Sequence, residues 1–176
     1  MKNQKKGILL GVTFLLTILL LGIGHVQAKA TTTSFETLEF LTGPPGAPEK
    51  VWVEDGTLYI RNQLFVFAVV EGDLSGIVEY CGNWNIDLAT MSGVGWGSNS
   101  FIGEWVTESP YTGPVGWLGH SVIKVTGFGG PDMFVSGKYL GHGTAGFEGM
   151  LIKGIFETDP VTGGTFLSGT VLNPQG

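Results

Sequence analysis

Histidine and cysteine are rare in this sequence, and their spacing restricts the chemistry that they could perform. His120 and His142 lie far apart and lack the short regular spacing by which two histidines on one strand or helix bind a metal ion. Cys81 is the only cysteine, so the chain can form no internal disulfide, and no histidine lies near it in the sequence. We therefore expect no metal site, and a catalytic triad would have to assemble from distant segments.

Acidic residues occur as close pairs, the arrangement that acid–base catalysis or calcium binding would require. The pairs are Glu54/Asp55, Glu71/Asp73, Glu104/Glu108 and Glu157/Asp159. Most of them fall at expected strand ends or turns, where solvation accounts for them, and their spacing matches no known calcium-binding loop. The glycine-rich segment 141–146 lacks the lysine and the strand–helix setting of a phosphate-binding loop. We therefore expect no bound cofactor.

Aromatic residues are the most suggestive group, because the chain carries five Trp and four Tyr residues. Core packing would account for many of them, but a cavity for an apolar ligand would use the same side chains. The segment 92–100, SGVGWGSNS, places Trp96 between glycines, so we predict a mobile loop that covers the mouth of a cavity of about 300 Å³ or more. The candidate ligand-binding residues are Trp96, Trp84, Trp105, Tyr80 and Cys81.

Short stretches rich in β-branched and aromatic residues, separated by Gly, Asn, Asp and Pro, must position these side chains. Residues 50–61, KVWVEDGTLYIR, predict a hairpin with Asp55-Gly56 as its two-residue turn. In this register Trp52 faces Tyr59, and the alternate residues share one buried face: Val51, Val53, Leu58 and Ile60. Further strands are expected at 63–71, 74–80, 84–90, 101–107, 116–126, 133–141, 146–157 and 165–172.

The pattern of strands and glycines predicts an all-β fold. No long stretch after residue 28 has a helical apolar period, and the chain contains 30 glycines, which disfavour helices and mark bends in strands. We expect a small antiparallel β-barrel of about eight strands, with a two-sheet β-sandwich as the alternative. This single domain would span residues 49–176 and follow a flexible leader at 29–48, which contains the break TGPPGAP.

The N-terminus resembles a secretory signal. Lys2, Lys5 and Lys6 precede an apolar run at 8–24, and small residues end at Ala28, so residues 1–28 are expected to form a signal helix that is cleaved. The protein would then be secreted or held at the cell surface. The alternative is an anchor formed by residues 8–24, the one expected route to a membrane. Without the three lysines, six basic residues face fifteen acidic ones, which argues against nucleic acid as a partner.

Two glycine-rich passages resemble one barrel superfamily. Residues 137–154, GKYLGHGTAGFEGMLIKG, are similar to the late strand pair of allene oxide cyclase-like and dirigent-like barrels, and Leu74-Ser-Gly76 followed by residues 83–87, NWNID, is similar to their earlier part. The resemblance implies an eight-stranded antiparallel barrel with an apolar cavity, often in dimers or trimers. Its members either fold a lipid epoxide into a ring or steer radical coupling. No active-site residue can be matched, so none is carried over.

These observations favour a secreted or cell-surface barrel that binds a small apolar molecule without catalysis. One alternative is a cyclase- or isomerase-like enzyme, which predicts a deep cavity with a buried polar group such as Cys81 or Glu71. The other is an extracellular structural subunit whose leader, residues 30–41, donates a strand to a neighbouring copy. A homo-oligomer is compatible with each of the three.

Overall fold

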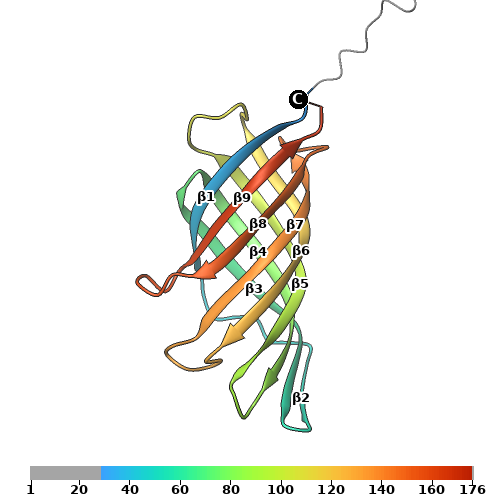
Figure 1. The fold of residues 1–176 in the computed structure, drawn as a ribbon, viewed down its shortest axis with the longest axis vertical. Coiled ribbons are helices and arrows are strands. Elements are labelled where there is room, and N and C mark those ends of the chain that lie inside the picture. The colour runs from blue at the N-terminus through green and yellow to red at the C-terminus, as the bar shows by residue number, and fades with distance from the viewer. Residues whose placement is uncertain (1–28, 176) are drawn as a thin grey trace, which may run out of the picture.

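The protein is a closed antiparallel β-barrel in the computed structural model, which describes residues 29–175 (Figure 1). Eight strands form the barrel and β2 is an extra strand at the edge of β3, which confirms the all-β barrel and excludes the sandwich. The strands are β1 (Thr31–Leu41), β2 (Lys50–Glu54), β3 (Thr57–Gly72), β4 (Leu74–Asp87), β5 (Ser92–Trp105), β6 (Pro114–Thr126), β7 (Phe134–Ala145), β8 (Leu151–Thr158) and β9 (Thr165–Asn173).

The expected signal segment 1–28 lies outside the described residues, and its cleavage stays a prediction. Within residues 29–175, no helix is long and apolar enough to cross a membrane.

Strand β1 closes the barrel by pairing with β9 on one side and with β3 on the other. Residues 31–39 pair with β9 and residues 37–41 pair with β3, so β1 closes the seam between these two strands. This differs from the flexible leader expected at 29–48, because a closed barrel needs a strand between β9 and β3. The segment 42–49 that follows β1 contains the Pro-Gly break and forms no strand.

The hairpin of β2 and β3 has the predicted register, in which Trp52 pairs with Tyr59 and Val53 with Leu58. Asp55 and Gly56 have φ values of 46° and 75°, as a tight primed turn requires. The predicted buried face is wrong for β2, however, since Val51 and Val53 are 53% and 59% exposed. Strand β2 pairs only with β3 and extends beyond the end of the barrel, so no other strand of residues 29–175 covers its apolar side (Figure 1).

The predicted mobile loop at 92–100 is wrong, because these residues begin strand β5 and pair along their length with β4 and β6. Gly95 and Gly97 of this segment occupy inward positions that aromatic rings fill from the neighbouring strand. A Cβ at Gly95 would lie 2.6 Å from the Trp84 ring, and one at Gly97 would lie 2.8 Å from the Tyr80 ring. The glycines therefore make room for the core, and Trp96 between them points outward.

Aromatic rings also lie across three pairs of glycines that face each other on adjacent strands. Tyr80 covers Gly82 and Gly97, Phe101 covers Gly76 and Gly103, and Tyr139 covers Gly154 and Gly169. Glycine lets strands bend sharply around a small barrel, and a ring placed over a glycine pair restores the packing that the absent side chains would provide.

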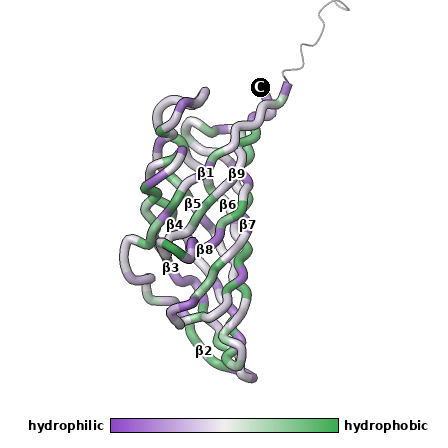
Figure 2. The backbone as a smooth tube through the Cα atoms, turned by 60° about the vertical axis from the view of Figure 1, so that its left-hand side comes forward, coloured by the Kyte–Doolittle hydropathy of each residue, from purple (hydrophilic) through white to green (hydrophobic). Residues whose placement is uncertain are grey.

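The buried residues form two clusters inside the barrel. The upper cluster, at the end that carries the C-terminus in Figure 1, has twelve buried members: Phe35, Val69, Leu74, Val78, Phe101, Val115, Trp117, Tyr139, Phe147, Ile152, Leu167 and Val171. The lower cluster consists of Ile60, Tyr80, Trp84, Ile86, Ile123 and Val125. Because inward and outward residues alternate along every strand, hydrophobic and hydrophilic positions are mixed over the whole barrel wall (Figure 2).

Candidate functional site

A cavity of about 100 Å³ lies where the two core clusters meet, lined by residues of both. All eight barrel strands contribute to its wall, and inward positions of β3, β4, β6, β7 and β8 each contribute at least one aromatic ring. These residues are Phe65, Phe67, Tyr80, Trp84, Trp117, Tyr139 and Phe156. The closed barrel holds the rings at fixed positions, so the site is shaped by the fold.

One polar group of the lining is satisfied within the protein. Asn99 of β5 donates from Nδ2 to Ser121 Oγ of β6 at 2.6 Å, and it accepts from Trp117 Nε1 at 3.2 Å. Asn99 and Ser121 are 8% and 6% exposed. This network fixes the Trp117 ring and uses one of the two lone pairs of the Asn99 carbonyl oxygen.

Three other polar atoms of the lining are buried and have no hydrogen-bond partner within the described residues. They are Glu39 Oε2, Tyr80 Oη and Trp84 Nε1. A buried polar atom without a partner costs about 1–3 kcal/mol, so three around one cavity are unusual for a purely structural core. They mark this cavity as the candidate site.

Burial also decides the protonation of these groups. It raises the pKa of Glu39 to about 8, so the carboxyl group is mostly protonated and uncharged at neutral pH. Burial raises the pKa of Tyr80 above its usual range, and Cys81 adds to the shift. Burial likewise raises the pKa of Tyr139, with Glu39 as a further cause. The lining is therefore neutral at pH 7, and Glu39 alone changes charge near pH 8.

Only two of the five predicted ligand-binding residues line the cavity, namely Tyr80 and Trp84. Trp105 lies within the upper end of the barrel, where it packs against Phe35 and Phe147 with ring centroids 6.1 Å away in each case. Trp96 is 40% exposed on the outer surface, with Arg61 Cζ 5.2 Å from its ring. Cys81 also faces outward, into a groove on the barrel wall.

Sequence reasoning missed the polar residues of the cavity: Glu39, Asn99 and Ser121. Glu39 lay in the segment that we expected to be a flexible leader, and Asn99 lay in the expected loop. Their inward direction follows from the strand register, which the sequence does not state. Neither polar group proposed for an enzyme lines the cavity. Glu71 is exposed to solvent, and the Cys81 side chain faces the outer surface of the barrel.

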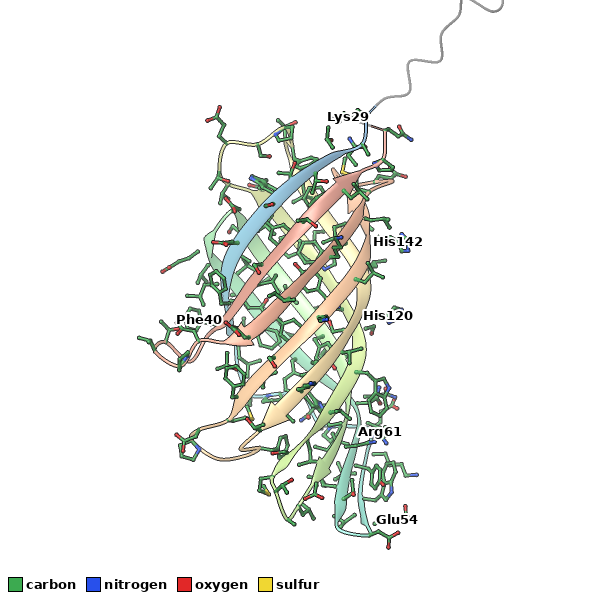
Figure 3. The ribbon with its side chains drawn as sticks, viewed as in Figure 1. Lys29, Phe40, Glu54, Arg61, His120 and His142 are labelled. Carbon is green, nitrogen blue, oxygen red and sulfur yellow. The ribbon has the colours of Figure 1, made fainter. Side chains whose placement is uncertain are left out.

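The side chains of His120 and His142 point away from the barrel (Figure 3). His120 and His142 line the same outer groove as Cys81, on strands β6 and β7. Within residues 29–175, no group of three or more His, Cys, Asp or Glu residues could hold a metal ion. Asp73 instead accepts hydrogen bonds from the backbone of Glu36 and from Thr107 Oγ1.

No known protein family matches this sequence, and no curated protein matches it either. The fold agrees with the eight-stranded barrel that the resemblance implied, but the arguments about function rest on the cavity itself. The prediction of a cavity of about 300 Å³ or more is wrong, since the cavity measures about 100 Å³.

Proposed function

We propose that this protein is a binding protein whose barrel holds one small, largely apolar molecule with a single polar group, without chemical conversion. The observation that carries the proposal is an aromatic cavity lined by the three buried polar atoms without partners. A ligand that bonded to them would offset the cost of burying these atoms without a partner. Its apolar part would gain the burial of its surface against the rings.

The size of the cavity limits the ligand to a compact molecule or a compact end group. An apolar cavity of about 150 Å³ is known to hold benzene, so one of about 100 Å³ fits a somewhat smaller molecule. A lipid epoxide that must fold into a ring needs several times this volume. The size therefore argues against the cyclase alternative and favours simple binding.

The expected signal segment supports secretion, which is part of the same proposal. A soluble extracellular binding protein suits the strongly acidic composition of residues 29–176. The N-terminal residue of the exported protein, read by mass spectrometry, tests this part: cleavage after Ala28 would leave Lys29 first.

Cavity filling tests the binding site directly. A panel of small neutral organic molecules, no larger than benzene, should bind the wild type saturably and shift the emission of Trp84 and Trp117. Val78→Phe adds a ring at an inward position of the lining, so it should abolish this binding. Ile77→Phe is the matched control, because Ile77 is 40% exposed on the outer face of the same strand.

Both variants must first show native circular dichroism and cooperative unfolding. If no member of the panel binds saturably, or if Val78→Phe binds as well as Ile77→Phe, the proposed function is wrong.

A further inference from the structure

The three unpartnered atoms of the cavity share one chemical property, which is that each can donate a hydrogen bond. The Trp84 indole N–H is a donor only, and the Tyr80 hydroxyl carries one hydrogen. The Glu39 carboxyl donates when it is protonated, which burial favours at neutral pH. The best acceptor nearby, Asn99 Oδ1, is already bonded to Trp117 Nε1.

The rest of the lining offers no countercharge. Among its described residues are aromatic, aliphatic and hydroxyl side chains and the Asn99 amide, but no Lys, Arg or His. An anionic ligand would thus lack a cation, and a cationic ligand would face the Trp84 N–H and require Glu39 to ionise in an apolar site. A neutral ligand avoids both costs.

We infer that the ligand is a small neutral carbonyl compound, an aldehyde or ketone, whose oxygen accepts hydrogen bonds from these donors. This inference rests on the proposed function and names the chemical class of its ligand. A carbonyl oxygen has two lone pairs and carries no hydrogen of its own, so it can accept two donors without requiring an acceptor in return. Its apolar substituents would lie against rings such as Phe65 and Phe156.

The charge state of Glu39 makes this inference testable by pH, because few other groups face the cavity. Strands β3 and β9 pair with β1 beside Glu39, and none of the side chains that they turn inward there titrates. These side chains are Phe65, Phe67, Val69, Thr165 and Leu167. The titratable groups on other strands of the lining are Tyr80 and Tyr139, whose raised pKa keeps them protonated over the range tested.

The experiment compares three probes that share one carbon frame: cyclobutanone, cyclobutanol and cyclobutylamine. Binding to the full exported protein is measured by ligand-observed NMR between pH 6 and 9. At pH 6 the ketone should bind at least about fivefold more tightly than the alcohol and about tenfold more tightly than the protonated amine. Ketone affinity should then fall as pH rises above about 8, when Glu39 loses its proton.

Two variants of Glu39 complete the test. Glu39→Gln keeps an N–H donor at every pH, so it should bind the ketone without the loss above pH 8. Glu39→Leu removes the donor and should bind the ketone at least about fivefold more weakly at pH 6. A native unfolding transition is required of both variants.

The outcomes separate this inference from the proposed function. Amine binding that exceeds ketone binding and strengthens above pH 8 would show that the ligand is a cation and overturn the inference. Equal binding of ketone and alcohol, or unchanged pH dependence in Glu39→Gln, would overturn it as well. In each of these cases the barrel still binds a small molecule. Failure of all three probes, together with the wider neutral panel, overturns the proposed function itself.

Discussion

Glu39 is the residue on which the site depends, and its burial has a measurable cost. Its pKa rises from 4.5 to about 8 on folding, so the native state holds this proton more tightly than the unfolded chain does. The contribution of Glu39 to the free energy of unfolding is therefore fully present below about pH 4.5, where its carboxyl group is protonated in both states. This contribution is lost as pH rises toward 8, because the carboxyl group ionises freely in the unfolded chain and does not in the native state.

Glu39→Gln should remove this loss of stability. We expect the wild type to lose up to about 4 kcal/mol relative to the variant between pH 5 and 8, at about 1.4 kcal/mol for each unit of pKa difference. Urea denaturation at intervals across this range measures the divergence. Glu36→Gln is the control, since Glu36 is exposed on the outer face of the same strand. Parallel stability curves for Glu39→Gln and the wild type would contradict the assignment.

Single residues were the least predictable part of this protein. Leu38 and Phe40 flank Glu39, so an apolar alternation would turn them inward and Glu39 outward. The register of β1 does the reverse, with Phe35, Thr37 and Glu39 buried. Pairing with β3 and β9, which come later in the chain, decides the direction. Tyr80 and Trp84 were predicted as candidates because they are aromatic, and the structure turns both inward because residues four apart along β4 share one face.

Strands and turns were predicted far better, because their signals are local. The Asp55-Gly56 turn and the side-chain alternation fixed the hairpin register, and each predicted strand from 63 onward overlaps one in the structure. Two of the errors occurred at glycines. Gly82 suggested a break within what is a single strand, β4, and the glycines around Trp96 suggested a loop. A local pattern does not reveal that an aromatic ring occupies the space that a side chain at the glycine would need.

The pairing of β8 with β9 depends on one of the glycine pairs that an aromatic ring covers. Gly154 faces Gly169, and a Cβ at Gly154 would clash with the Ser168 carbonyl oxygen and lie 2.6 Å from Cζ of the Tyr139 ring. Gly154→Ala should therefore destabilise the protein by about 1–3 kcal/mol, because the ring must move. Gly43→Ala should be neutral or slightly stabilising, since its Cβ would meet nothing within 4 Å.

Thermal and urea denaturation measure both glycine variants, and a double-mutant cycle assigns the cause. In a Tyr139→Leu background Gly154→Ala should cost less, because the clash with the ring is absent and only the contact with the Ser168 carbonyl oxygen remains. An equal loss of stability in both backgrounds would mean that the added methyl group clashes with the backbone and not with the Tyr139 ring.

Closure by β1 determines whether one chain forms the barrel alone or shares it with a second copy. The barrel needs this strand for its seam with β9 and β3, for the buried Phe35, and for Glu39 in the cavity. The structural-subunit alternative requires the same residues, 30–41, to leave and pair with another copy. A chain that closes its own barrel and a chain that exchanges β1 have the same pairing pattern, so covalent linkage must distinguish them.

A designed disulfide across the β1–β9 seam makes this distinction. Ser34 pairs with Thr170, and both line a groove on the outer surface, so cysteines there would oppose each other at a distance that a disulfide spans. Replacing Cys81 with Ser removes the only native thiol. In this background Ser34→Cys with Thr170→Cys should oxidise to a monomer that migrates faster on a non-reducing gel and unfolds at a higher temperature. Ser34→Cys alone should do neither. A covalent dimer that forms at low protein concentration would instead show strand exchange, and the cavity would then be completed by a strand of the neighbouring chain.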